Sequence, residues 1–115
     1  MITIRHITVL GSTGSIGVST LDVVARHPER FRVAALTANT SAKEMLEQCK
    51  RFQPRYAVLL EEASADWLRM EVRAAGLATE VLWGVASLEK VASLPEVDIV
   101  MATIVGGRPI FPVAD

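Results

Sequence analysis

The sequence predicts an α/β fold in which a parallel β-sheet carries helices on both faces. Three observations support this prediction. Short apolar runs alternate along the chain with segments whose apolar residues recur at helical spacing. The first two runs are separated by the length of a parallel strand-helix-strand crossover. With 115 residues, 50% of them hydrophobic, the chain has the size of one ordinary domain and can bury a core.

The first predicted crossover covers residues 4–36. Residues 4–10 are mostly apolar or β-branched, which is typical of a central strand covered on both faces. Residues 15–27 have a helical apolar period, and this helix must end before Pro28. Residues 31–36 predict the second strand, which should pair in parallel with the first. The apolar positions of the helix are Ile16, Val18, Leu21, Val24 and Ala25.

A second helix is predicted from Ser41 to Phe52. Ser41 and Glu44 have the spacing of a capping box, in which each side chain accepts a hydrogen bond from the other residue's backbone N–H. Cys49 lies on the apolar stripe of this helix, so we expect a core residue rather than a nucleophile. Because it is the only cysteine, no internal disulfide can form, and we expect a reducing, cytoplasmic location.

Three more strands and two more helices are expected in the rest of the chain. The strands are residues 56–60, 80–83 and 97–102, and the last helix is residues 87–93. The helix between the first two of these strands should end at Gly76. Its expected inward face consists of Trp67, Leu68, Val72 and Ala75. Trp83 is also expected to be a packing residue.

The charge balance limits the possible partners. The formal net charge is -1, from 12 basic and 13 acidic residues, so no overall field attracts nucleic acid or an anionic membrane. No apolar run approaches the roughly 20 residues that cross a bilayer, and the first residues lack an export-signal pattern. We therefore expect neither a nucleic-acid nor a membrane partner. A bound anion would have to be held by local geometry.

A glycine-rich stretch between the first strand and helix is the main candidate for such geometry. Its G-x-x-G-x-x-G spacing differs from the common G-x-G-x-x-G dinucleotide fingerprint. The same roles can be filled, since Gly11 permits the turn, Gly14 a close approach to pyrophosphate, and Gly17 close helix packing. This predicts a Rossmann-like dinucleotide site, with a plain strand-to-helix turn as the alternative. The expected donors are the N–H groups of Thr13, Ser15 and Ile16 and the hydroxyls of Ser12, Thr13 and Ser15.

The residues after the second strand favour NADP over NAD. An NAD site usually has Asp or Glu there, about 20 residues beyond the glycines, to bind the ribose 2'-hydroxyl. This chain has Asn39, Thr40 and Ser41 instead, so no carboxylate repels a 2'-phosphate. Ser41 has an equally good interpretation as a plain helix cap. Lys43 lies nearby and is expected to face solvent.

The glycine stretch and its continuation resemble the amino-terminal signature of the 1-deoxy-D-xylulose 5-phosphate reductoisomerase family. The resemblance covers nearly the whole chain to about Gly107. It implies an NADPH-dependent enzyme that converts 1-deoxy-D-xylulose 5-phosphate to 2-C-methyl-D-erythritol 4-phosphate in non-mevalonate isoprenoid biosynthesis. The matching segments are residues 11–17, 19–24, 31–33, 53–58 and 101–106.

The resemblance also implies residue roles. Residues 13–16 would contact the cofactor pyrophosphate, residues 39–41 the adenosine 2'-phosphate, and residues 102–105 would pass close to the cofactor. Family members often carry Lys or Arg within the segment from Asn39 to Ser41, where this chain has Thr40 and no basic residue. Motif and resemblance together give these cofactor-binding residues: Gly11, Thr13, Gly14, Ser15, Ile16, Gly17, Asn39, Thr40, Ser41, Ala102, Thr103 and Ile104.

No catalytic or metal-binding residue is expected in this chain. His6 and His27 do not have the spacing of a metal pair, and neither Asp22 nor Asp98 has a partner that spacing alone identifies. By resemblance, the carboxylates that hold Mg or Mn and the substrate site lie beyond the equivalent of Asp115. We therefore expect an NADPH-binding domain over residues 1–107, an irregular tail over 108–115, no activity for the chain alone, and a homodimer for full-length members.

Two other functions are compatible with the same pattern. One is a different NADP-linked oxidoreductase, such as a semialdehyde dehydrogenase, in which a downstream cysteine would replace the metal-ligand carboxylates. The other is a module that binds a dinucleotide and performs no chemistry.

Overall fold

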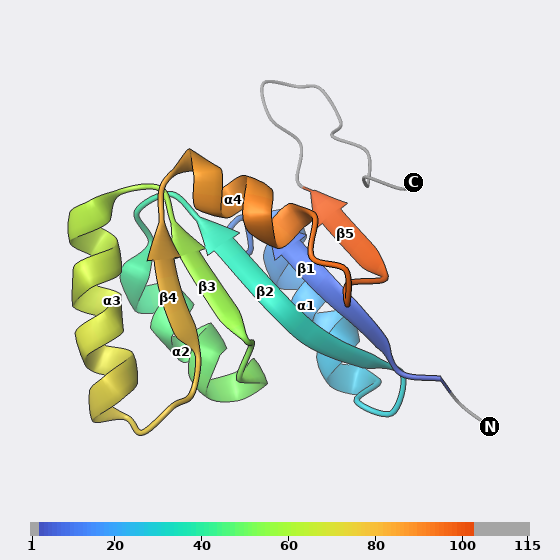
Figure 1. The fold of residues 1–115 in the computed structure, drawn as a ribbon. Helices are drawn as coiled ribbons and strands as arrows, with labels where there is room; N and C mark the ends of the chain where they lie inside the picture. Colours follow the sequence, from blue (N-terminus) through green and yellow to red (C-terminus); the bar gives the residue numbers. More distant parts are fainter. Residues whose placement is uncertain (1–2, 103–115) are drawn as a thin grey trace.

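The computed structural model describes residues 3–102, which form a five-stranded sheet with four helices. All strand pairs are parallel, in the order β4-β3-β2-β1-β5. The α/β fold with a parallel Rossmann-like sheet is thereby confirmed (Figure 1). The strands are β1 (Arg5–Leu10), β2 (Phe31–Ala38), β3 (Tyr56–Leu59), β4 (Glu80–Trp83) and β5 (Ile99–Ala102).

The helices cover both faces of the sheet, as the alternating pattern predicts. The strands from β1 to β4 are added in one direction, so right-handed crossovers place the three helices between them on one face. The return from β4 to β5 runs in the opposite direction, and α4 therefore lies on the other face (Figure 1). The helices are α1 (Ser15–Arg26), α2 (Ala42–Phe52), α3 (Glu62–Ala74) and α4 (Val85–Ala92).

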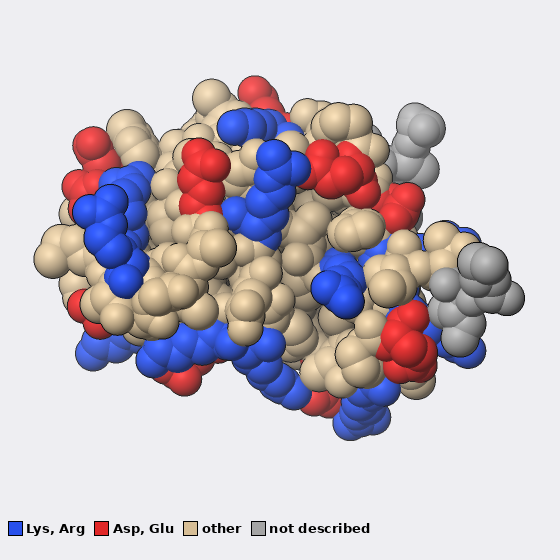
Figure 2. Space-filling view, turned by 60° about the horizontal axis from the view of Figure 1, so that its bottom comes forward, with Lys and Arg blue, Asp and Glu red and all other residues tan. Residues whose placement is uncertain are grey.

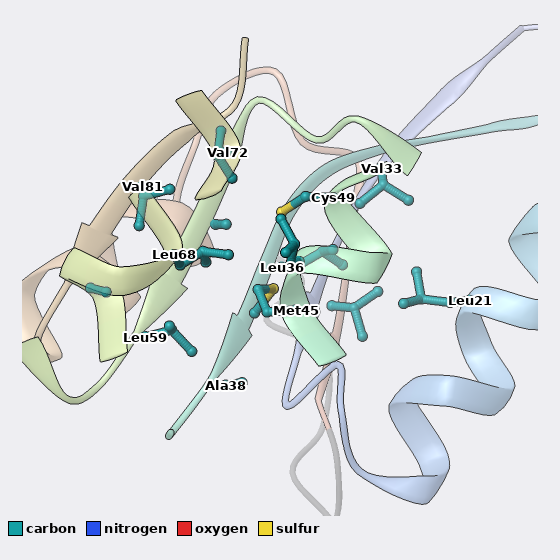
Figure 3. Packing of buried hydrophobic residues seen from close by; sticks show 14 of the residues in the cluster. Leu21, Val33, Leu36, Ala38, Met45, Cys49, Leu59, Leu68, Val72 and Val81 are labelled. Atoms are coloured by element: carbon teal, nitrogen blue, oxygen red, sulfur yellow. The ribbon is translucent and has the colours of Figure 1, made fainter. Parts of the chain in front are cut away.

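The larger part of the core lies between the sheet and α1, α2 and α3. Figure 3 shows Leu36 of β2 against Met45 and Cys49 of α2, and all three side chains are fully buried. Each large apolar side chain buried in this way contributes about 1.5–3 kcal/mol relative to exposure. A smaller cluster forms on the α4 face from Ala35, Tyr56, Val58 and Val91.

Helix α1 contacts the rest of the molecule through fewer apolar residues than its sequence predicts. Its buried residues are Gly17, Leu21 and Val24, while Ile16 is 39% and Val18 51% exposed. Because successive helical residues are about 100° apart, the two neighbours of Gly17 point to either side of the contact. The helical period of the apolar residues is present, but only part of it is buried against the sheet.

The tryptophan predictions are also wrong. Helix α3 buries Ala65, Leu68 and Val72, whereas Trp67 lies beside this stripe and is 37% exposed. Ala75, expected on the same face, is exposed as the residue that follows the last helical turn. Trp83 is 47% exposed because it ends β4, an edge strand of the described sheet. Leu68 and Val72 do face inward, as expected.

Most element boundaries agree with the sequence to within two residues. Gly76 ends α3 with φ of 72°, a conformation that glycine adopts without strain. β2 extends two residues beyond the predicted end because Thr37 and Ala38 pair with Val58 and Leu59 of β3. This extension places Asn39 directly after the carboxyl end of β2.

The surface mixes both signs of charge. Acidic and basic side chains are interspersed over the face shown in Figure 2, in keeping with the formal net charge of -1. Within residues 3–102, the structure contains no helix long and apolar enough to cross a membrane.

Candidate cofactor site

A cleft of about 410 Å³ lies at the carboxyl ends of β1, β2 and β5. The strand order reverses between β1 and β5, and ligands of open parallel sheets bind at such a point. A second hollow, of about 550 Å³, lies at the carboxyl ends of α1 and α2 and includes the first residues of β2. It is therefore at the amino ends of the strands, away from the glycine loop. The cleft is lined by Leu10, Gly11, Thr13, Gly14, Thr37, Ala38, Asn39, Ser41, Leu88 and Ala102.

The loop from β1 to α1 turns at Gly11, whose φ of 75° suits a residue without a Cβ. Gly14 N–H donates to the Gly11 carbonyl oxygen at 3.2 Å, which closes the turn. The first intrahelical bond runs from Val18 N–H to the Gly14 carbonyl oxygen at 2.8 Å. The N–H groups of residues 15–17 precede this bond, so they are the orphan donors of the α1 amino terminus. Such donors can bind an anion.

Gly17 lets α1 pack directly on this loop. A Cβ at position 17 would lie 2.3 Å from the Gly11 carbonyl oxygen and 2.7 Å from Ser12 Cα. Both neighbours are backbone atoms, so no side-chain rotation could relieve the contact. The close approach predicted for Gly17 is present, although its partner is the loop rather than a strand.

Two residues that sequence reasoning missed hold the loop in place. Thr37 Oγ1 accepts a hydrogen bond from Gly11 N–H at 3.0 Å, and the Thr37 carbonyl oxygen accepts one from Ser12 N–H at 2.8 Å. Gln48 of α2 accepts from the Ser12 hydroxyl at 2.7 Å and donates Nε2–H to the Ser12 carbonyl oxygen at 2.8 Å. Ser12 is fully buried. Its hydroxyl therefore faces Gln48 and is not an available phosphate donor, contrary to expectation.

The structure brings half of the predicted cofactor residues to the cleft and places four more near it. Ser15 and Ile16 lie in the exposed first turn of α1, and Gly17 is buried beneath the loop. Thr40 lies in an adjoining hollow rather than in the cleft. Thr103 and Ile104 lie outside the described residues. The predicted residues that line the cleft are Gly11, Thr13, Gly14, Asn39, Ser41 and Ala102.

Ser41 precedes α2 as its N-cap, but the capping box is not formed. Its φ of -77° and ψ of 64° give no side-chain capping hydrogen bond. The hydroxyl therefore remains available at the cleft wall. Ser41 also lines the adjoining hollow, where Lys43 contributes one positive charge and Glu44 and Glu61 contribute two negative charges. Lys43 is exposed, as expected.

Leu10 and Leu88 add apolar surface to the cleft, and neither was predicted from sequence. Leu88 lies on α4, which crosses the opposite face of the sheet from α1. Only the direction of the final crossover brings α4 beside the glycine loop. The alternation of strands and helices could have indicated this placement, but no local motif could.

The described residues do not form a metal centre. Within residues 3–102, no group of three or more His, Cys, Asp or Glu side chains could hold a metal ion. The Asp98 carboxylate accepts a hydrogen bond from the backbone N–H of His6 at 2.8 Å, and Asp22 pairs with Arg26 at 2.9 Å. Cys49 is buried, and this burial raises the pKa of its thiol to about 12, which suits a core residue.

A family model for 1-deoxy-D-xylulose 5-phosphate reductoisomerase matches residues 7–115. The chain belongs to this family. The reductoisomerase match extends beyond Gly107, where the resemblance was expected to end, and it decides against the semialdehyde dehydrogenase alternative.

Curated relatives of the reductoisomerase family are similar over nearly the whole chain. A 1-deoxy-D-xylulose 5-phosphate reductoisomerase from Nitrosospira multiformis is 75% identical over 97% of this chain, and one from Nitrosomonas eutropha is 63% identical over 97%. The matched regions make up 28% and 27% of these relatives. The chain therefore spans about a quarter of their length.

Solved reductoisomerase structures share the fold. A DOX-P reductoisomerase in complex with magnesium matches with a TM-score of 0.85 and 38% identity, over 90% of this chain and 26% of that one. A complex with NADPH, fosmidomycin and magnesium matches with a TM-score of 0.84 and 37% identity, over 90% and 25%. The reductoisomerase from Zymomonas mobilis in complex with NADPH gives 0.82 and 38%, over 90% and 27%.

Proposed function

We propose that this chain is the amino-terminal NADPH-binding part of a 1-deoxy-D-xylulose 5-phosphate reductoisomerase. The whole enzyme would convert 1-deoxy-D-xylulose 5-phosphate to 2-C-methyl-D-erythritol 4-phosphate in non-mevalonate isoprenoid biosynthesis. The observation that carries this proposal is the glycine loop at the reversal of strand order, with the amino terminus of α1 beside the cleft. The family match and the NADPH complexes of related proteins give it further support.

The residues of the cleft fit the pyrophosphate of NADPH. Among residues 3–102, none of the side chains that line it carries a charge, so no carboxylate of this part of the chain opposes the anion there. Gly14 leaves its position open, since the nearest atom to an added Cβ would be 3.6 Å away. The N–H groups of Ser15 and Ile16 would donate to phosphate oxygens at the positive end of the α1 dipole. When bound, NADPH supplies the hydride for reduction.

Asn39, Thr40 and Ser41 would receive the adenosine 2'-phosphate. Asn39 and Thr40 are exposed at the end of β2, and the free Ser41 hydroxyl adds a donor. No carboxylate of the described residues lines the cleft at this strand end, which favours NADPH over NADH. The carboxylates of Glu44 and Glu61 in the adjoining hollow repel the 2'-phosphate. We therefore expect only a moderate preference for NADPH over NADH. On the other side of the cleft, Ala102 would lie near the cofactor, followed by Thr103 and Ile104.

Other parts of the whole enzyme would supply the remaining chemistry. Since residues 3–102 form no metal centre, Mg or Mn would be held elsewhere, together with the substrate. We therefore propose that the 115-residue chain binds NADPH without turning over the substrate. We also propose that the protein is cytoplasmic and that the whole enzyme is a homodimer. A spectrophotometric assay at 340 nm checks the absence of turnover, and NADPH oxidation dependent on the substrate would contradict it.

Isothermal titration of the chain with NADPH and NADH tests the cofactor proposal. We expect the chain to bind NADPH more tightly than NADH. Gly14→Val should lose the binding of both cofactors, because its branched side chain would occupy the cleft at the pyrophosphate position. Equal affinity for the two cofactors would contradict the role of residues 39–41. Unchanged binding by the Gly14 variant would contradict the pyrophosphate assignment.

A further inference from the structure

We propose that Gln48 is a positioning residue that fixes the pyrophosphate loop from outside the cofactor cleft. This inference rests on the proposed NADPH site. Gln48 lies on α2 and is not among the residues that line the cleft. It would act through Ser12, the buried residue between Gly11 and the open positions of the loop.

The contact between Gln48 and Ser12 uses both ends of the side-chain amide. The Oε1 atom accepts from the Ser12 hydroxyl at 2.7 Å, and Nε2 donates to the Ser12 carbonyl oxygen at 2.8 Å. That carbonyl belongs to the peptide group whose N–H is contributed by Thr13. Because a peptide group is planar, fixing its oxygen also fixes the direction of the Thr13 N–H.

The loop depends on this contact because the other α2 partner of the Ser12 hydroxyl is a weak one, the Met45 Sδ atom at 4.0 Å. Ser12 N–H and Gly11 N–H are held by Thr37, and both bonds lie at the β2 side of the loop. Gln48 supplies the bonds to the Ser12 hydroxyl and carbonyl oxygen from α2. Ser12 is 0% exposed, so water cannot replace these partners without opening the site.

The same helix begins next to the ribose-side residues. Ser41 is the N-cap of α2, and Gln48 follows seven residues later, about two turns along the helix. One rigid element therefore connects the 2'-phosphate side of the cleft with the pyrophosphate loop. This arrangement would keep the two halves of the cofactor site in fixed relation.

Loss of the amide should lower the population of the binding-competent loop. The apparent dissociation constant rises in inverse proportion to that population. Removing two hydrogen bonds, each worth about fivefold in such an equilibrium, shifts it by roughly thirtyfold, and part of this shift does not reach the dissociation constant as long as the competent loop predominates. We therefore expect the NADPH dissociation constant of Gln48→Met to rise about tenfold. Methionine keeps a similar length without the amide.

The experiment compares two probes, NADPH and adenosine 2'-monophosphate, which lacks the pyrophosphate. Gln48→Met should weaken NADPH binding about tenfold while changing the affinity for adenosine 2'-monophosphate by less than about twofold. Glu47→Gln is the matched control, because Glu47 is an exposed neighbour on the same helix, and it should leave both affinities unchanged. Equal weakening of both probes, or of neither, would overturn the positioning role. If the wild-type chain binds neither probe, the proposed function itself has failed.

Three further measurements cover the case in which Gln48→Met does not fold: a second single variant, a double variant, and hydrogen exchange in the wild-type chain. Gln48→Glu keeps the acceptor for the Ser12 hydroxyl but loses the donor to the carbonyl oxygen, and it should show the same selective loss. Combined with Ser12→Ala, its effect on NADPH affinity should be less than additive, because both changes act on one contact. In the wild-type chain, NADPH should slow hydrogen exchange of the Gln48 side-chain amide. Unchanged exchange on NADPH binding contradicts the inference.

Discussion

Gly17→Ala should disrupt the loop through a single added methyl group. The new Cβ would lie 2.3 Å from the Gly11 carbonyl oxygen, 2.7 Å from Ser12 Cα and 2.9 Å from the Ser12 carbonyl carbon. Non-bonded heavy atoms rest at roughly 3.5–4.0 Å. All three neighbours are backbone, so α1 and the loop must separate by about 1 Å to accept the methyl group.

The net cost follows from two opposing effects. Overpacking of this kind costs about 1–3 kcal/mol, and the strong contacts at Gly17 place it at the upper end. Alanine offsets about 1 kcal/mol of this through its higher helix propensity. We therefore expect Gly17→Ala to lower the free energy of unfolding by about 2 kcal/mol, or the melting temperature by about 8 °C at roughly 4 °C per kcal/mol.

Gly14→Ala is the matched control for the assay. Its Cβ would lie no closer than 3.6 Å to the Gly11 carbonyl oxygen, and its φ of -76° suits alanine. Thermal unfolding followed by circular dichroism should show a change within about 0.5 kcal/mol for Gly14→Ala. Titration with NADPH should show weakened binding for both variants. The reasoning is refuted if Gly17→Ala is as stable as the wild type, or if both variants lose the same stability.

Three further changes test the surroundings of the site and the core. Thr40→Lys should strengthen NADPH binding about threefold to fivefold without affecting NADH binding, since it adds a positive charge at the 2'-phosphate side. Titration with both cofactors checks this, and an equal gain for NADPH and NADH would contradict it. Burial raises the pKa of the Cys49 thiol from 9.0 to about 12, so the folded state keeps its proton longer than the unfolded state. The free energy of unfolding should thus fall by up to about 1.4 kcal/mol per pH unit between pH 9 and about 12, and urea titrations should lose this component in Cys49→Ala. Leu68→Ala should lower the free energy of unfolding by about 2–5 kcal/mol because Leu68 is fully buried, and Trp67→Ala should lower it by less than half as much. Thermal melts measure both, and similar losses for the two variants would place Trp67 in the core.

The sequence predicts the fold and the glycine loop well because both depend on local patterns. Gly11 has a φ that residues with a Cβ rarely adopt, and Gly17 has no room for a Cβ, so their positions can be interpreted directly. The order of strands and helices fixes the crossovers once their handedness is known. The position of Asn39 and Ser41 at the cleft then follows from the end of β2.

The support of the loop could not be predicted because it joins distant positions. Gln48 is separated from Ser12 by 36 residues, and in the sequence it appears as a polar residue beside the apolar stripe of α2. Amphipathic patterns also fail for large side chains at the margin of a buried stripe, as the exposed Trp67 shows. The Ser41 motif fails for a different reason: the spacing to Glu44 is correct, but the backbone angles of Ser41 do not direct its hydroxyl to the helix.

The pairing of β5 with β1 has a consequence for the order in which the chain folds. The strands from β1 to β4 are joined to their neighbours through short crossovers, whereas β5 must return across some 90 residues, as in the contact of His6 with Asp98. Closing so long a loop is slow compared with closing the local ones. We expect β5 to join last and to open first, so its amides should exchange with solvent before those of β2 and β3. Since Ala102 ends β5 and lines the cleft, the cofactor site would be the last part of the molecule to become complete.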